Sequence, residues 1–227
     1  MQTLRFNGFA MIHKALRAML YETASKMQQT NFADVTATEA VLAKAERILE
    51  LFDDHADHED HHILSGITDV NAELAHSFEQ EHVKDRGLCA ALRQGIAAYK
   101  EAQTPVDRIV AGNKVFYAFN EFIAFNLQHM NKEENELNET LWAKYSDPEI
   151  VGINQKIAAS VAPDKAFDNL TWMMRSCNDT EIGMFIKAIR SSAPEPLVNL
   201  LMNTAQAELQ PERWEKISAT LSEEAPV

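Results

Sequence analysis

Two histidines in the sequence are each followed, four residues later, by a glutamate. The pairs are His55 with Glu59 and His129 with Glu133. Four residues make about one turn of an α-helix, so on a helix both side chains of a pair leave the same face. Imidazole binds iron, zinc and copper, and a carboxylate can bridge two metal ions while supplying negative charge. The two pairs therefore indicate metal binding.

Two single histidines, His13 and His82, lie on further segments with helical apolar spacing. Taken alone, any one of the four histidines is more often an ordinary core or surface residue. Together the four histidines favour a metal site, because helices in a bundle lie about 8 to 10 Å apart and side chains from four of them can converge on two ions. We predict a two-metal site with the histidines as terminal ligands and the glutamates as bridges: His13, His55, Glu59, His82, His129 and Glu133.

The elements that must position these residues are predicted to be long helices. Apolar spacing and cap signals place the helices at residues 4–29, 38–64, 68–103 and 105–145. Short connections make neighbouring helices antiparallel, so the fold class is all-α and residues 1–147 form an up-down-up-down four-helix bundle. We expect 148–227 to be a helical appendage that packs on the bundle or binds a partner, with short helices at 148–160, 163–177, 179–191, 196–209 and 211–221.

The composition excludes several other functions. A formal net charge of -13 argues against a nucleic-acid partner and against an anionic membrane surface. The apolar stretch near the N-terminus is interrupted by His13, Lys14 and Arg17, so we predict no signal peptide and no membrane span, and a cytoplasmic protein. Cys89 and Cys177 are expected to be reduced thiols. No phosphate-binding loop or nucleophile motif occurs, and no catalytic residue is assigned.

The first 147 residues resemble a hemerythrin-like, or HHE cation-binding, domain. Four pieces of sequence carry the resemblance: IHKALRAML, H-x-x-x-E-D-x-x-I-L from His55 to Leu64, the dipeptide Glu81-His82, and H-M-x-x-E-E-x-x-L from His129 to Leu137 followed by YSDPE. Proteins of this family hold a non-haem di-iron centre in an antiparallel four-helix bundle. The resemblance implies two iron ions here, although zinc or manganese suits the same donors.

One departure from the family pattern bears on function. Oxygen-carrying hemerythrins pair two histidines one turn apart on the third helix, whereas here Phe78 and Arg86 lie one turn either side of His82. This implies a centre one ligand short of the carriers, with an open position. We therefore expect binding or sensing of O2, NO or peroxide, or iron handling. The alternatives are a di-iron oxidase or peroxidase, and a metal-stabilised protein that binds a partner or a second copy through residues 148–227.

The sequence alone leaves two assignments open. His58 and His62 form a second pair one turn apart beside His55, and the family register favours His55 because Ile63 and Leu64 then fit. His58 is the first spare ligand, and His61 and His62 are expected at the rim. His76 lies off the face of His82 and is not assigned as a ligand. A ferritin-like centre, with Glu-x-x-His at Glu59 and Glu79, is disfavoured because both copies fall on consecutive helices.

Overall fold

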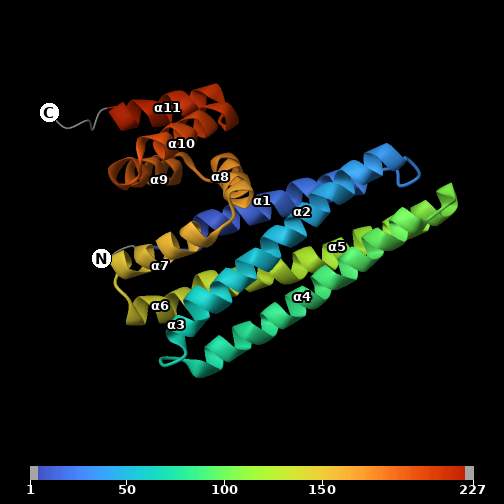
Figure 1. The fold of residues 1–227 in the computed structure, drawn as a ribbon, viewed down its shortest axis with the longest axis horizontal. Coiled ribbons are helices and arrows are strands. Elements are labelled where there is room, and N and C mark those ends of the chain that lie inside the picture. The colour runs from blue at the N-terminus through green and yellow to red at the C-terminus, as the bar shows by residue number, and fades with distance from the viewer. Residues whose placement is uncertain (1–4, 223–227) are drawn as a thin grey trace. The chain divides into compact units, whose positions relative to one another are not determined.

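The structure, a computed structural model, describes residues 5–222, and this part of the chain is helical with no strand (Figure 1). Four helices are long: α1 (Ala10–Gln29), α2 (Val35–Glu59), α4 (Ala72–Glu101) and α5 (Pro105–Lys132). Two of them continue through a π-helical segment into a further α-helix. Helix α2 continues into η1 (Asp60–Leu64) and α3 (Ser65–Ile67), and α5 continues into η2 (Glu133–Leu137) and α6 (Asn138–Lys144).

Five shorter helices follow, as the proline spacing predicts. They are α7 (Asp147–Ser160), α8 (Pro163–Ser176), α9 (Asp179–Ser192), α10 (Glu195–Glu208) and α11 (Pro211–Ser222). Proline stands in the first turn of α7, α8 and α10, where its missing N–H costs no helical hydrogen bond. Asn178 begins α9 with a capping box, in which its side chain accepts from the backbone N–H of Glu181 at 3.0 Å.

The described chain divides into two compact units, each with its own core. One comprises residues 5–9 and Met19–Val161, and the other comprises Ala10–Ala18 and residues 162–222, so that α1 contributes to both. A core cluster of the first unit consists of Phe9, Ile63, Leu64, Ile67, Ala75, Phe78, Leu137, Leu141 and Ile150. That of the second consists of Met174, Cys177, Ile182, Ile186, Leu201, Ala205, Leu209, Ile217 and Leu221.

Helices α2, α4 and α5 lie side by side in the first unit, and α4 is antiparallel to both neighbours (Figure 1). The direction follows from the polar contacts, which occur in opposite order along the paired helices. The contacts are Asp57–Arg86 and Glu46–Lys100 between α2 and α4, and Asp85–Asn126 and Ser77–Lys132 between α4 and α5. Aromatic rings fill the space between α2 and α5, where Phe52 meets Phe122 edge to face at 5.1 Å.

The first helix begins later than the apolar spacing predicts. The predicted helix 4–29 starts at Leu4, which lies outside the described residues, whereas α1 starts at Ala10. Residues 5–9 are held instead by the chain after α6. Arg5 donates to Asp147 Oδ1 at 2.6 Å and to the Tyr145 carbonyl at 2.7 Å, so its side chain is held by residues distant in the sequence.

Gly112 allows the ring of Phe32 to lie directly against α5. A Cβ at position 112 would lie 2.2 Å from Phe32 Cγ, and the Phe32 side chain is buried. Gly112→Ala is therefore expected to lower the free energy of unfolding by about 1–3 kcal/mol in urea denaturation, because the buried ring has to move. Gly152→Ala on α7 is the matched control, since a Cβ there meets nothing within 4 Å. An unchanged or raised stability in Gly112→Ala would contradict this account of the contact.

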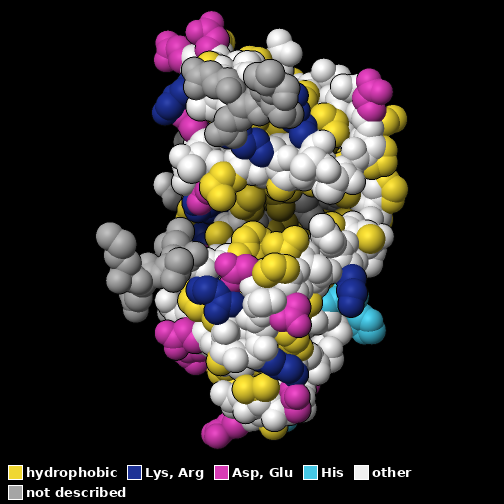
Figure 2. All heavy atoms as spheres, turned by 90° about the vertical axis from the view of Figure 1, so that its left-hand side faces the viewer, with side chains coloured by type: hydrophobic (Ala, Val, Ile, Leu, Met, Phe, Trp, Pro, Cys, Tyr) yellow, Lys and Arg dark blue, Asp and Glu magenta, His cyan; other side chains and the backbone are white. Residues whose placement is uncertain are grey.

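The surface mixes charges of both signs. On the face drawn in Figure 2, Lys and Arg side chains are scattered among Asp and Glu, with hydrophobic side chains between them. Among residues 5–222, no helix combines the length and the apolar character that crossing a membrane requires.

Candidate metal centre

The ligand atoms of two four-residue groups lie within 4.8 Å of one another inside each group. The first group is Glu59, His82, His129 and Glu133, and the second is His13, His55, Glu59 and Glu133. Glu59 and Glu133 belong to both groups. The structure thus brings together all six residues that the sequence singles out.

In the first group, two imidazole nitrogens face two carboxylates. His129 Nε2 lies 3.1 Å from Glu133 Oε1, and His82 Nε2 lies 3.4 Å from Glu59 Oε2. The two Nε2 atoms are 3.1 Å apart, which is about the separation of adjacent ligands around an ion that binds each nitrogen at about 2.0–2.1 Å. All four side chains are at most 5% exposed. Nitrogen and carboxylate donors in a dry site fit a transition-metal ion.

The second ring nitrogen of His82 is held by a carboxylate. His82 Nδ1 lies 2.6 Å from Asp60 Oδ1, and Arg86 Nη2 donates to the other Asp60 oxygen at 2.8 Å. A carboxylate that accepts from Nδ1–H fixes the ring and makes Nε2 the more basic ligand. Asp60 therefore orients His82 toward Glu59.

His129 is held in the same way from α4. Its Nδ1 lies 2.7 Å from Glu81 Oε2, and Lys132 donates to Glu81 Oε1 at 2.6 Å. Glu81 directly precedes His82 in the sequence, so neighbouring residues of α4 serve two different imidazoles. Sequence reasoning did not assign this role to Asp60 or Glu81. The signal available was their position beside the candidate ligands Glu59 and His82.

Asp60→Ala is expected to weaken metal binding about 10- to 100-fold without changing the number of ions bound at saturation, because it frees the His82 ring but removes no donor. Competition against a chromophoric chelator measures the affinity. Asp57→Ala is the matched control, since Asp57 also pairs with Arg86, at 2.8 Å, but has no contact with His82. Equal affinities in the two variants would show that Asp60 has no orienting role.

Both shared glutamates lie at a boundary between α-helix and π-helix. Glu59 is the last residue of α2 before η1, and Glu133 is the first residue of η2. A π-helical turn holds one more residue than an α-helical turn, so it changes the direction in which side chains leave the helix, and such turns are frequent at functional sites. The predicted helices 38–64 and 105–145 are therefore not uninterrupted α-helices, and both interruptions coincide with the candidate site.

The two carboxylates attract positive charge strongly. Burial alone would lower the pKa of His82, but the neighbouring carboxylates of Glu133 and Glu59 raise it to about 11. Burial likewise opposes protonation of His129, yet the charge of Glu133 and a hydrogen bond to it raise its pKa to about 9. The buried carboxylates therefore favour positive charge between them, and a bound metal ion would supply that charge in place of protons.

A buried polar pair that sequence reasoning missed lies one turn from the two histidines. Asp85, on α4 after His82, accepts a hydrogen bond of 2.6 Å from Asn126 Nδ2, on α5 before His129. Burial raises the pKa of Asp85, whereas the hydrogen bond from Asn126 opposes that shift. Cys89 Sγ lies 3.9 Å from Asp85, and burial raises the pKa of this thiol. Cys89 and Cys177 are both free and buried, as expected.

The remaining histidines stand apart from both groups. The rings of His58, His61 and His62 contact one another, with centroids of His61 and His62 4.6 Å apart. Among the residues that the structure describes, neither ligand group includes any of these three or His76. His76 is exposed and lies 3.4 Å from Glu79. Glu79 is exposed as well. Among the described residues, the Glu79–His82 pair therefore does not supply the second Glu-x-x-His that a ferritin-like centre needs.

The positions one turn either side of His82 hold no donor for the ligand groups. Phe78 is fully buried, and its ring meets His129 edge to face with centroids 5.7 Å apart. Arg86 points to the carboxylates of Asp57 and Asp60. Helix α4 thus supplies one imidazole.

Comparison with known proteins identifies the family of the chain. A family model described as "Hemerythrin HHE cation binding domain" matches residues 6–141, which include all six candidate ligands. The chain belongs to the hemerythrin HHE cation-binding family. No curated protein and no protein of solved structure matches it.

Proposed function

We propose that this protein holds a non-haem di-iron centre inside a hemerythrin-like up-down-up-down bundle formed by α1, α2, α4 and α5. Residues 148–227 form a helical appendage in this proposal. The observation that carries it is the sharing of Glu59 and Glu133 between two groups of possible ligand atoms. Two carboxylates common to two clusters are what a pair of adjacent ions needs, since a carboxylate has two oxygens and can bridge.

The proposal gives each residue a role. His13 and His55 would hold one ion, His82 and His129 would hold the other, and Glu59 with Glu133 would bridge them. When bound, such an iron pair would supply a site for O2, NO or peroxide. The protein itself holds the imidazoles through Asp60 and Glu81 and keeps water out by burial.

Binding or sensing of a small neutral ligand is favoured by the surroundings of His129. The rings of Phe78 and Phe125 lie next to its imidazole, with centroids 5.7 and 5.8 Å away. Because Phe78 occupies the place of a further ligand, one coordination position is left open in this proposal. An apolar surrounding favours entry of O2 or NO over that of charged species.

Anaerobic titration of the reduced, iron-loaded protein with NO or O2 tests this function. A stoichiometric change of the visible spectrum is expected, and it should be lost in His129→Ala. A spectrum that stays unchanged at saturating NO and O2 would contradict ligand binding. Sustained peroxide consumption faster than that of free iron, and lost in His129→Ala, would assign an oxidase or peroxidase instead.

A second candidate function, partner binding by the second unit, is favoured by its exposed apolar side chains. Phe167 is 49% exposed and Met184 67% exposed, and Leu197 and Leu200 are exposed too. Deletion of residues 162–227 followed by comparison of proteins co-purified from the same cells tests this role. Identical co-purified proteins with and without these residues would argue against it.

A further inference from the structure

The outward face of α5 carries uncharged residues at alternating spacings of four and three. We call this row the α5 seam: Val106, Val110, Asn113, Tyr117, Asn120, Ala124, Leu127 and Asn131. Val106, Val110 and Tyr117 are 68%, 51% and 63% exposed. The seam spans 25 residue steps, or about 38 Å of helix. A 4-3 repeat of this kind is the pattern by which one helix packs along another.

This face is electrically neutral in a strongly acidic protein. Residues 105–131 carry two acidic and two basic side chains, whereas the chain as a whole has a formal net charge of -13. Two copies of the chain repel one another over most of their surfaces, and a neutral face is where this repulsion is smallest. The four charged side chains are Asp107, Arg108, Lys114 and Glu121.

We propose that the α5 seam binds the α5 seam of a second copy of this chain, with the two helices antiparallel and related by a twofold axis. In such a pair centred near residue 118, Lys114 of each copy lies beside Glu121 of the other, because both follow a seam residue by one position. The pairing therefore creates two identical ion pairs across the axis. Within the described part of the chain, neither Lys114 nor Glu121 forms an ion pair.

The orientation follows from the two edges of the seam. One edge holds only polar residues, Asp107, Lys114, Glu121 and Gln128, while the other holds apolar residues, Ile109, Phe116 and Ile123 and the buried Met130. In a parallel pair, each edge meets the opposite edge of the partner helix, so Lys114 and Glu121 would face apolar side chains. The antiparallel pair brings like edges together and gives both charges a partner.

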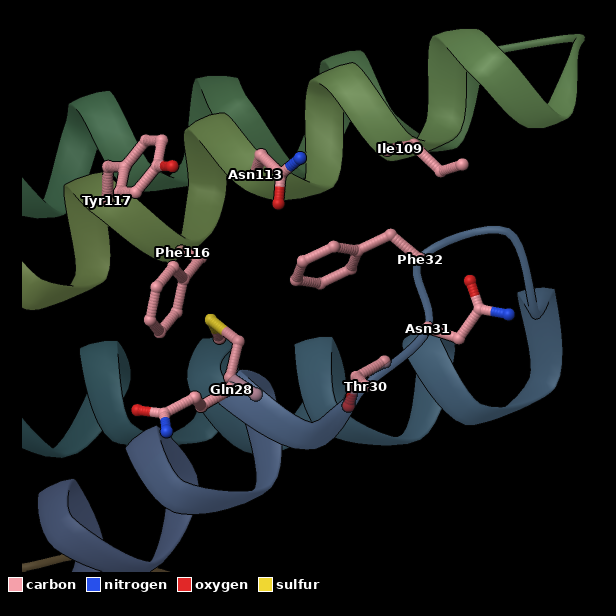
Figure 3. Close-up of a pocket in the computed structure, with 9 residues that line it drawn as sticks. Gln28, Thr30, Asn31, Phe32, Ile109, Asn113, Phe116 and Tyr117 are labelled. Carbon is pink, nitrogen blue, oxygen red and sulfur yellow. The ribbon is translucent and has the colours of Figure 1, made fainter.

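A cavity beside the seam supports the seam as the interface with a second copy. It has a volume of about 280 Å³ and lies between α5 and the segment after α1. Figure 3 shows that Asn113 and Tyr117, two seam residues, line it together with Phe32 and Thr30. In the antiparallel pair, Ala124 and Asn120 of the second copy lie opposite Asn113 and Tyr117. The second copy would therefore cover the open side of this cavity.

Sedimentation velocity of the full, metal-loaded chain over a range of concentrations tests the proposal. The wild type is expected to sediment as a dimer, twice the 25.6 kDa of the chain. Tyr117→Glu is expected to sediment as a monomer, because it places a carboxylate in the seam of both copies. Met184→Glu, which changes an exposed residue of α9, is the control and should leave the dimer intact. Circular dichroism and metal content confirm that each variant is folded.

A charge reversal identifies the register. Lys114→Glu and Glu121→Lys are each expected to weaken dimerisation about tenfold or more, because each replaces two ion pairs by two like-charge contacts. The double variant should recover the wild-type affinity. A monomeric wild type at every concentration would overturn the proposal, as would a dimer that survives Tyr117→Glu or a double variant that is not restored. Loss of the dimer in Met184→Glu would place self-association on the second unit instead.

Discussion

Replacing Glu133 by alanine is expected to remove nearly all bound metal. Glu133 is fully buried and is shared by both groups of ligand atoms, so its loss takes an oxygen donor from each ion at once. Its Oε1 also lies 3.1 Å from Nε2 of His129, another candidate ligand of the first group. Elemental analysis should show a fall from about two ions per chain, the number for a two-metal site, to near zero.

Three further variants separate a bridging role from a general effect of the substitution. Glu136→Ala removes an exposed carboxylate from the same π-helical segment and should bind as much metal as the wild type. His55→Ala should lose one ion, because His55 belongs to one group only. His58→Ala should lose none. Full metal content in Glu133→Ala would refute the bridging assignment, and loss in His58→Ala would show that the register of α2 is wrong.

Removal of the metal is expected to destabilise the protein strongly. Glu59 and Glu133 are 2% and 0% exposed, and a bound cation compensates their charge in the folded state alone. With free metal at a thousand times its dissociation constant, binding to the folded state adds about 4 kcal/mol of stability. For a chain of this size, its loss corresponds to a fall in Tm of about 8–16 °C.

Calorimetry with and without a chelator measures this change. Glu133→Ala provides the control, because a variant that binds no metal should show the same Tm in both conditions. A wild-type Tm that does not respond to removal of all metal would show that the centre contributes nothing to folding stability.

Most of the helices followed from the sequence, and the six residues that it singled out as ligands lie close together in the structure. Helix starts and ends are local properties, and proline and cap residues mark them, so the short helices after Pro148 were predicted within about two residues. The pairs His55–Glu59 and His129–Glu133 were visible because their spacing is that of a helical turn. Helix α1 was placed too early, since its start depends on a distant partner of Arg5, Asp147.

What the sequence did not predict depends on the register between helices. The contacts of Asp60 with His82 and of Glu81 with His129 join residues 22 and 48 positions apart. Such contacts follow only once the helices are packed side by side. The π-helical segments η1 and η2 were also missed. Apolar spacing is compared with the period of an α-helix, and a single wider turn changes that spacing too little to be detected. The Asp85–Asn126 pair likewise joins two helices.

The most direct test of a di-iron centre is elemental analysis of the protein from iron-supplemented culture, with visible spectra under air and after reduction. A di-iron centre requires about two iron ions per chain, as in other two-metal sites. It should also have an absorption in its oxidised state that changes on reduction and is absent from Glu133→Ala. Protein that carries zinc, or no metal, after expression in excess iron would contradict the presence of a di-iron centre.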